Sequence, residues 1–320
     1  MVKKTITRGF SKTFEPKVRV FGKTILDISE KSAFKPVFRK RFPKLTEFWK
    51  TLTILIIFCS FCFFGGCNVD IGGFFTSTDV DERLKERGNL KLLDSEGWTV
   101  ALSLGDEYSF IVVSDTHIED GNAHGLEKLK DAAAAEEIKF AVMLGDITQY
   151  GSERDINKYI EIAKLLEVPC YPVIGNHDIY FGNWSVWKSK IGSTNYKING
   201  GNTTLLFLDS ANSLFGKDQL DWLEREIKTA SGRVFVFTHS PLFVTGPADM
   251  QQVSDTKERA RIVSILRGKC DIMFMGHLHK RIITEKGNVK YLAMDDFVRN
   301  KTYCVVTVTA SGVKYSFKKL

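Results

Sequence analysis

The chain has 320 residues, of which 43% are hydrophobic, and a formal net charge of +7. This length has room for one large domain or two small ones, with enough apolar residues for a sizeable core. Residues 1–50 contain 14 Lys and Arg against 4 Asp and Glu, a net charge of +10, which leaves −3 for the other 270 residues. The composition therefore argues against a general nucleic-acid-binding surface on the globular part.

The six cysteines do not form a disulfide framework. Three lie within or at the end of one apolar run, namely Cys59, Cys62 and Cys67. Cys59 and Cys62 form a CxxC that lies inside a hydrophobic stretch of the sequence, which argues against a redox or zinc motif. The other three are scattered in strand-like contexts, where we expect buried free thiols, with a disulfide among them as the alternative: Cys170, Cys270 and Cys304.

An apolar segment follows the basic N-terminal tail. Residues Thr51 to Gly66 carry no charge, and they are preceded by the basic stretch RKRFPK at 39–44. The run is short for a transmembrane span, which needs about 20 residues, and close to the length of a signal-peptide core. The basic flank predicts that the tail stays inside and the rest of the chain lies outside. Small residues before Cys67 resemble a bacterial lipoprotein cleavage box, which implies that Cys67 becomes a lipidated N-terminus.

The N-terminal region therefore divides into three predicted parts. Residues 1–50 are a basic tail, cytoplasmic or missing from the mature protein, and 51–67 are a signal or anchor segment. Residues 68–107 are expected to be a linker ending in a strand that enters the domain. We predict a membrane-associated bacterial lipoprotein with its globular domain outside the cytoplasm. The alternatives for 51–67 are an uncleaved anchor helix and a buried core helix.

From Tyr108 the chain alternates between apolar runs and helical segments. The apolar runs are four to six residues long, and helices are expected at 125–138, 152–167, 218–230 and 256–268. This alternation is typical of an α/β fold with buried, largely parallel strands. After His279 the pattern changes to strands joined by turns, and we expect a single domain over 108–320.

Polar motifs stand at the C-terminal ends of these apolar runs. They contain five of the six histidines in the chain, and they are Asp115-Thr116-His117, Gly145-Asp146, Gly175-Asn176-His177-Asp178, His239 and Gly276-His277-Leu278-His279. The sixth, His124, is expected to be an ordinary surface residue. A Gly-Asp pair is usually a turn and a lone histidine is more often structural. Ligands bind at the carboxyl edge of open α/β sheets, so the whole series predicts a functional site there.

This series resembles the signature of the calcineurin-like metallophosphoesterase superfamily: DxH, GD, GNH[D/E], H and GHxH. All five blocks are intact, and the resemblance extends over about 108–320. Weaker features resemble the branch that includes class III cyclic-nucleotide phosphodiesterases, namely Phe207–Ser210, Gln219–Leu223 and GDITQYGSERD. The resemblance implies a four-layer αββα sandwich, in which helices flank two mixed β-sheets.

The resemblance also implies a dinuclear metal site and a small-molecule phosphoester substrate. Asp146 is expected to bridge two divalent cations; one is completed by Asp115, His117 and His279, the other by Asn176, His239 and His277. Two such cations neutralise the phosphate, lower the pKa of a bound water to supply hydroxide, and align it with phosphorus. Mixed Asp, Asn and His ligands suit Mn, Fe, Zn or Ni comparably.

Two further expectations concern individual histidines. His177 matches the family residue that contacts the phosphate and protonates the leaving oxygen. In His277-x-His279, an extended backbone would place both rings on one side. Purple acid phosphatases have Gly and Tyr where this chain has His117 and Gln149, so an iron–tyrosinate site is not expected.

The sequence favours an active hydrolase over a binding module that has lost catalysis, because no expected ligand is missing. Two classes of substrate remain open: extracytoplasmic phosphodiesters or phosphomonoesters, and cyclic nucleotides. The resemblance favours cyclic nucleotides, but an exported domain would not meet the cytosolic pool. We expect specificity to lie in loops such as 243–252.

Overall fold

The computed structural model describes residues 78–86, 88–89, 102–244 and 251–320. They all belong to one compact unit that spans Gly65–Leu320. The apolar segment at 51–67, with its candidate lipidation site Cys67, lies outside the described residues. Within the described ranges, no helix has both the length and the apolar character needed to cross a bilayer.

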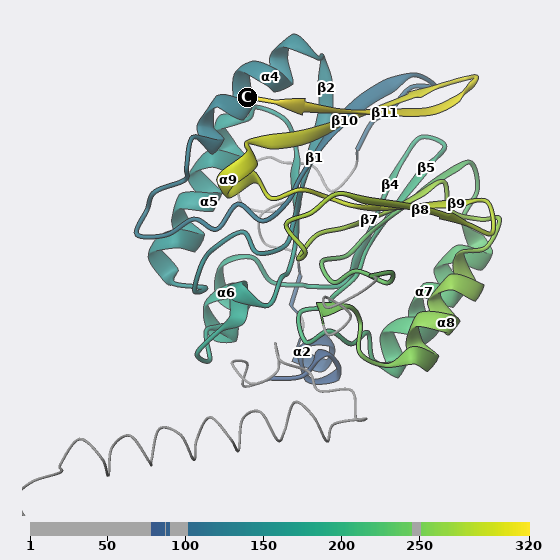
Figure 1. The fold of residues 1–320 in the computed structure, drawn as a ribbon, viewed down its shortest axis with the longest axis horizontal. Helices are drawn as coiled ribbons and strands as arrows, with labels where there is room; N and C mark the ends of the chain where they lie inside the picture. The colour runs from purple at the N-terminus through teal and green to yellow at the C-terminus, as the bar shows by residue number, and fades with distance from the viewer. Residues whose placement is uncertain (1–77, 87, 90–101, 245–250) are drawn as a thin grey trace, which may run out of the picture. The chain divides into compact units, whose positions relative to one another are not determined.

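The first of two β-sheets has five strands in the order β11-β10-β1-β2-β3 (Figure 1). Its strands are β1 (Tyr108–Val113), β2 (Ile138–Leu144), β3 (Cys170–Val173), β10 (Thr302–Thr309) and β11 (Gly312–Lys319). β1, β2 and β3 run parallel, while β10 pairs antiparallel with β1 and with β11. The carboxyl ends of β1, β2 and β3 therefore meet at one edge of this sheet.

The second sheet has six strands in the order β4-β5-β6-β7-β9-β8. Its strands are β4 (Tyr196–Gly200), β5 (Thr203–Phe207), β6 (Arg233–Phe237), β7 (Ile272–Met275), β8 (Ile282–Lys286) and β9 (Val289–Ala293). The four central strands are parallel, and β4 and β8 are antiparallel edge strands. Both sheets are mixed, as expected.

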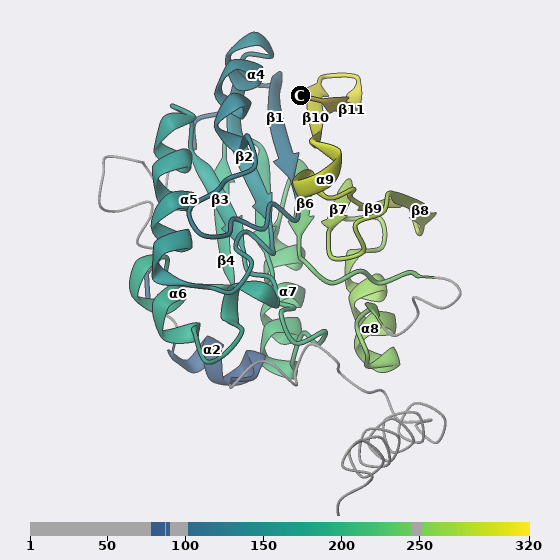
Figure 2. The same ribbon diagram turned by 60° about the vertical axis from the view of Figure 1, so that its left-hand side comes forward.

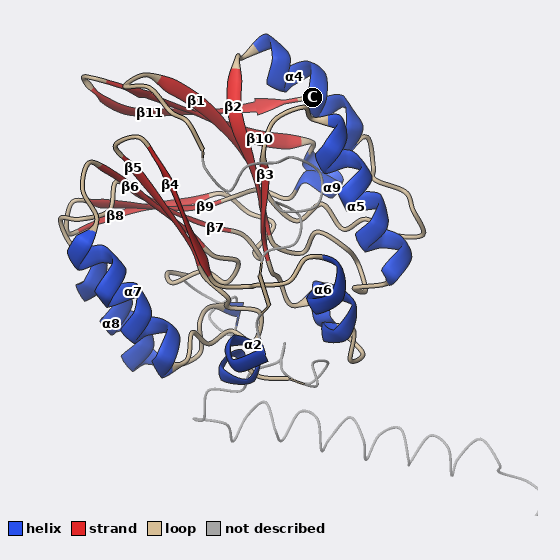
Figure 3. Ribbon diagram, turned by 180° about the vertical axis from the view of Figure 1, so that it is seen from behind, coloured by secondary structure: helices blue, strands red, loops and turns tan. Residues whose placement is uncertain are grey.

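Helices cover the outer faces of the two sheets. The first sheet is flanked by α4 (Leu129–Ala135), α5 (Glu153–Leu165) and α6 (Trp184–Lys190), and the second by α7 (Lys217–Thr229) and α8 (Thr256–Leu266). Figures 2 and 3 show the sheets between these two groups of helices. Short helical segments complete the fold: η3 (Leu126–Lys128), η4 (His177–Ile179), α9 (Phe297–Asn300) and α2 (Val80–Glu86). This arrangement confirms the expected αββα sandwich.

The core follows the period-two alternation of the strands. In β6, Phe235 and Phe237 point between the sheets, where the ring of Phe110 from β1 lies 5.1 Å from the ring of Phe235. Their neighbours Val234 and Val236 belong instead to a second apolar cluster with residues of α7 and α8. Since alternate residues of a strand face opposite ways, one strand serves both cores.

All four expected helices are present, and side chains cap two of them. The Ser152 hydroxyl accepts a hydrogen bond from the Asp155 amide at the start of α5, and Asp255 caps α8 in the same way. Such caps satisfy backbone N–H groups that the first turn leaves unpaired. The cysteines outside the apolar run are buried and free, as expected: Cys170, Cys270 and Cys304.

The structure differs from expectation before β1. Within the stretch interpreted as a linker, α2 packs against the domain, and described residues 102–107 form no strand. Arg83 of α2 is fully buried and pairs with Asp209, which follows β5. Glu86 accepts hydrogen bonds from Trp184 and Lys188 of α6. These long-range contacts hold α2 against the domain, and they could not be predicted from its seven residues.

Candidate active site

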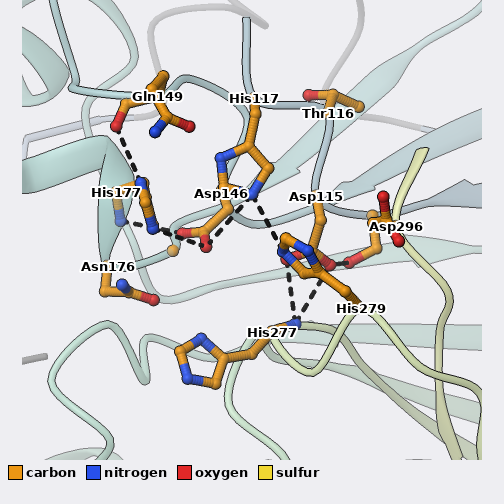
Figure 4. Close-up of polar contacts among 12 residues, drawn as sticks. Asp115, Thr116, His117, Asp146, Gln149, Asn176, His177, His277, His279 and Asp296 are labelled. Carbon is orange, nitrogen blue, oxygen red and sulfur yellow. Dashed lines mark hydrogen bonds and ion pairs between the residues drawn. The ribbon is translucent and has the colours of Figure 1, made fainter. Parts of the chain in front are cut away.

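The candidate site lies where strands of both sheets end. Asp115 and Asp146 each stand two residues beyond the ends of β1 and β2, and His239 and His277 stand two beyond β6 and β7. Asn176 follows β3 by three residues. The structure thus brings all seven candidate ligands together, as Figure 4 shows for most of them.

The first donor cluster consists of Asp115, His117 and His279, whose ligand atoms all lie within 4.8 Å of one another. The Nε2 atoms of His117 and His279 are 3.2 Å apart, and Nε2 of His279 is 3.3 Å from Oδ1 of Asp115. Asp115 is completely buried, and it also accepts hydrogen bonds from the Ser114 hydroxyl and the His277 amide.

The second donor cluster consists of Asp146, His239 and His277, again within 4.8 Å. Nε2 of His239 lies 3.2 Å from Oδ2 of Asp146 and 3.1 Å from Nδ1 of His277. The side-chain oxygen of Asn176 is 3.2 Å from the same Nε2 and adds a fourth donor.

Asp146 stands between the two clusters. Its Oδ2 is 3.2 Å from His239 in the second cluster and 3.9 Å from Nε2 of His117 in the first. The side chain is 2% exposed, so no bulk water shields its charge. A buried carboxylate in this position can be shared by two cations.

The hydrogen bonds around the clusters fix which atoms face inward. Nδ1 of His239 lies 3.0 Å from the Leu144 carbonyl, which can only accept, so Nδ1 donates there and Nε2 is the ring atom that faces the cluster. Asn176 donates its Nδ2 to the Tyr180 hydroxyl at 2.5 Å, which turns Oδ1 toward the cluster. Converging carboxylate oxygens, an amide oxygen and imidazole nitrogens form a donor set that suits divalent transition metals.

Electrostatics favour a cation at the same place. Burial alone would raise the pKa of Asp146, but His239 and His177 outweigh it and hold that pKa well below its ordinary value. Burial would lower the pKa of His239, but the charge of Asp146 raises it to about 9. For His277, burial and the neighbouring His239 lower the pKa to about 4. The buried Asp146 carboxylate thus stays ionised and attracts positive charge.

The backbone at the site is unusual. Left-handed φ angles occur at five candidate ligands: Asp115, His117, Asp146, His277 and His279. Each such residue costs about 1–3 kcal/mol, and such strain gathers at functional sites. The expectation of an extended backbone at His277-x-His279 is therefore wrong: the two rings turn toward different clusters.

Gly145 explains how the loops approach so closely. Its φ is +83°, and a Cβ at this position would lie 2.4 Å from Nδ1 of His239. Any side chain here would collide with a ring from the other sheet. The glycine before Asp146 therefore permits contact between the strand ends of the two sheets.

His177 lies beside the clusters and is more accessible than most of their members. Its Nδ1 donates to the Gln149 carbonyl at 2.9 Å, so Nε2 points the other way, 3.9 Å from Oδ2 of Asp146. The side chain is 24% exposed. Its ring packs edge-on against His117, with ring centroids 4.7 Å apart. This position is accessible to a ligand that binds over the clusters.

Sequence reasoning missed several residues that hold the site together. Asp178 is fully buried and accepts from the amides of Ile147, Thr148 and Gly175, which ties the two central loops to each other. Burial, together with the charge of Asp146, raises the pKa of Asp178 to about 6. The only sequence signal for the role of Asp178 was its place in the GNHD motif.

Two further neighbours of the clusters were also missed. His124 is half-buried rather than an ordinary surface residue, and its Nε2 lies 3.1 Å from the His117 carbonyl. Arg299 pairs with the buried Asp296, which caps α9, and its Nη2 is 2.8 Å from Nδ1 of His279. Neither residue belongs to a motif, so only the tertiary contacts identify them.

Comparisons with known proteins agree with this geometry. A sequence model of the calcineurin-like phosphoesterase family matches residues 108–281. A probable cyclic nucleotide phosphodiesterase from Fibrobacter succinogenes is 27% identical over 190 residues, covering 53% of this chain and 72% of the relative. The 3′,5′-cyclic adenosine monophosphate phosphodiesterase of Pseudomonas aeruginosa is 25% identical over 205 residues, covering 57% of this chain and 74% of the relative.

Solved structures agree on the fold. A dimetal phosphatase from Danio rerio superposes with a TM-score of 0.53 at 16% identity, covering 66% of this chain and 98% of that one. The purple acid phosphatase PPD1 of yellow lupin gives a TM-score of 0.52 at 10% identity, covering 68% of this chain and 52% of the lupin chain.

Two mixed sheets flanked by helices, with clustered carboxylates and histidines at the strand ends, define a metallophosphoesterase. The chain belongs to the calcineurin-like phosphoesterase family, and it is a phosphoester hydrolase. The family typically binds divalent metals, and the two clusters described above can hold them.

Proposed function

We propose that this protein is a phosphodiesterase or phosphatase that works with two divalent cations. The observation that carries this proposal is the position of Asp146, whose buried carboxylate lies within reach of both donor clusters. One cation would be held by Asp115, His117 and His279, and the other by Asn176, His239 and His277, with Asp146 common to both.

Two bound cations would supply charge neutralisation for the phosphate and a lowered pKa for water at the site. The chain's own contribution is orientation. Hydrogen bonds from His239 to Leu144 and from Asn176 to Tyr180 turn the donor atoms inward before any ligand arrives. Asp178 fixes the loops that carry these residues.

His177 is the candidate general acid. The Gln149 carbonyl holds the proton on Nδ1, so a second proton on Nε2 would make the ring an imidazolium directed toward the site. That proton can pass to the leaving oxygen as the P–O bond breaks. The ring is fixed at its far nitrogen and accessible at the near one, which suits this role.

A hydrolysis panel tests the proposal. Purified protein with added Mn²⁺ would be assayed against mono-, di- and cyclic phosphoesters, with EDTA as the control. We expect metal-dependent turnover of phosphodiesters or phosphomonoesters. Turnover that is unaffected by EDTA, or no turnover of any ester with Mn²⁺, Fe²⁺, Zn²⁺ or Ni²⁺, would refute it.

A cyclic nucleotide is the second candidate substrate. The names of the Fibrobacter and Pseudomonas relatives favour it, each with more than 70% of its own length matched. In the same panel, preferential hydrolysis of 3′,5′-cyclic nucleotides over linear diesters would support this candidate.

We also propose membrane attachment with the catalytic domain, predicted at 108–320, outside the cytoplasm. The proposal rests on sequence alone: the +10 tail, the uncharged run Thr51 to Gly66, and small residues before Cys67. It bears on the substrate, because an exported enzyme would not meet cytosolic cyclic nucleotides.

A further inference from the structure

Two exposed aromatic rings lie together beside the candidate active site. Phe181 is 68% exposed and Tyr150 is 42% exposed, and their ring centroids are 6.1 Å apart. Aromatic pairs normally lie 4.5–7 Å apart, so these rings are in contact. Isolated exposed apolar residues need no explanation, but a contacting pair at the edge of a functional site points to a ligand surface.

The backbone holds Phe181 in an unfavourable conformation. Its φ is +56°, in the left-handed region that side chains with a Cβ rarely adopt. Since the ring gains little burial in return, neither packing nor backbone preference accounts for this conformation. Strain of this kind at a solvent-exposed side chain suggests that the position of the ring serves binding.

The rings are carried by the two loops that also carry candidate ligands. Tyr150 follows Asp146 by four residues, and Phe181 follows Asn176 by five. The Tyr150 carbonyl accepts a hydrogen bond from Nδ2 of Asn183 at 2.7 Å, which fastens one loop to the other. This hydrogen bond involves neither ring, so the two loops that carry the rings are held together independently of the contact between the rings.

A third ring links this pair to the site. The ring centroid of Tyr180 is 4.4 Å from His177 and 6.0 Å from Phe181, and its hydroxyl accepts from Nδ2 of Asn176. A continuous aromatic surface thus runs from the candidate general acid to the exposed pair. We call Tyr150, Tyr180 and Phe181 the aromatic platform.

We propose that the aromatic platform binds a flat ring in the alcohol part of the substrate, as in the base of a nucleotide ester. A phosphate bound over the donor clusters would lie next to His177, and the rest of the ester would extend along the platform. Uncharged rings offer stacking faces to any base and no partner for a second phosphate. The inference deepens the proposed function, on which it rests, by naming the substrate class.

The test compares two inhibitors that differ only in the base. Inhibition constants of AMP and ribose 5-phosphate would be measured with Mn²⁺-loaded protein and a chromogenic diester. Removing a stacking ring weakens base binding by about 5- to 150-fold. We expect Tyr150→Ala and Phe181→Gly each to raise the constant for AMP by at least about fivefold and to leave ribose 5-phosphate within about twofold.

Matched variants separate binding from structural support. Tyr150→Phe keeps the ring and should retain the affinity for AMP. Phe181→Gly removes the ring and suits the left-handed backbone, so its melting temperature should not fall. Leu165→Ala, which trims another exposed apolar residue on α5, should change neither constant. Equal weakening of AMP and ribose 5-phosphate, or no weakening of either, would overturn the proposal.

Failure of the proposed function can be told apart from failure of this inference. If the protein hydrolyses no ester, the same pair of ligands can be compared by calorimetric titration in EDTA. Tighter binding of AMP than of ribose 5-phosphate, lost in Tyr150→Ala, would still support the platform. Indistinguishable binding of the two ligands to the wild type would overturn it.

Discussion

Arg83 and Asp209 form a bidentate ion pair in which both side chains are fully buried. Nε donates to Oδ2 and Nη2 donates to Oδ1, each at 2.8 Å, although the residues are 126 positions apart. Nη1 of Arg83 donates to the Thr78 carbonyl, also at 2.8 Å. The pair fastens α2 to the second sheet and makes residues 78–86 part of the catalytic unit.

The first prediction is that Arg83→Met destabilises the protein by about 3–5 kcal/mol, because it leaves the Asp209 carboxylate buried without a partner. Denaturant unfolding would measure this change. The control is Lys188→Met, which breaks a pair with Glu86 whose side chains are 42% and 50% exposed. Such surface pairs contribute about 0–1 kcal/mol. A loss of the same small size in Arg83→Met would contradict the prediction.

Asp146→Asn should nearly abolish hydrolysis while the fold survives. The substitution keeps the shape of the side chain and removes the charge that both clusters share. Removing partners outside the ligand shell already weakens metal sites about 10–100-fold, so we expect a loss of activity of at least about 100-fold. Turnover and bound metal would be measured on the same sample, with circular dichroism to check folding. Wild-type turnover with full metal content would show that the assignment is wrong.

His177→Ala should keep the bound metal but lose about 10²–10⁴-fold in rate, the usual contribution of general acid catalysis. The loss should be smaller for nitrophenyl esters, whose leaving group needs no proton. A series of diesters with leaving groups of different pKa would measure this dependence. The same loss for every leaving group would indicate that His177 binds the phosphate and does not protonate the leaving oxygen.

Metal binding should stabilise the folded protein. At a free metal concentration 100 times the dissociation constant, the expected gain is about 2.7 kcal/mol for one site. Thermal unfolding with EDTA, and then with excess Mn²⁺, would measure it as a rise in melting temperature. Asp146→Asn should show a smaller rise. Identical curves in EDTA and Mn²⁺ would be incompatible with metal sites at these clusters.

Cys67 should incorporate labelled fatty acid when the full chain is expressed in a bacterial host, and Cys67→Ser should not. An uncleaved anchor would instead give a full-length, membrane-bound protein without label. Fractionation of the cells would distinguish the two. Full-length protein in the soluble cytosolic fraction would contradict both the lipidated form and the uncleaved anchor. Cytosolic cyclic nucleotides would then be the leading candidate substrate.

The sequence by itself determined which residues of the site stand at the carboxyl ends of strands. Buried parallel strands appear as short apolar runs, and the residues that follow each run lie at the carboxyl edge of the sheet. Asp115, Asp146, His239 and His277 could therefore be assigned to carboxyl ends of strands, which the structure confirms, although it divides these strands between two sheets. Helices α5 and α8 could also be predicted from the sequence, because their apolar spacing and capping residues are local features.

Only the tertiary structure decided how these strand ends meet. The Nε2 atoms of His117 and His279 come within 3.2 Å although 162 positions separate them, because the two sheets pack face to face. The left-handed backbone of His277, the burial of Arg83 and the contact of Tyr150 with Phe181 arise in the same way. Local sequence patterns specify which face of an element is apolar, but contacts between distant segments depend on the packing of the whole domain.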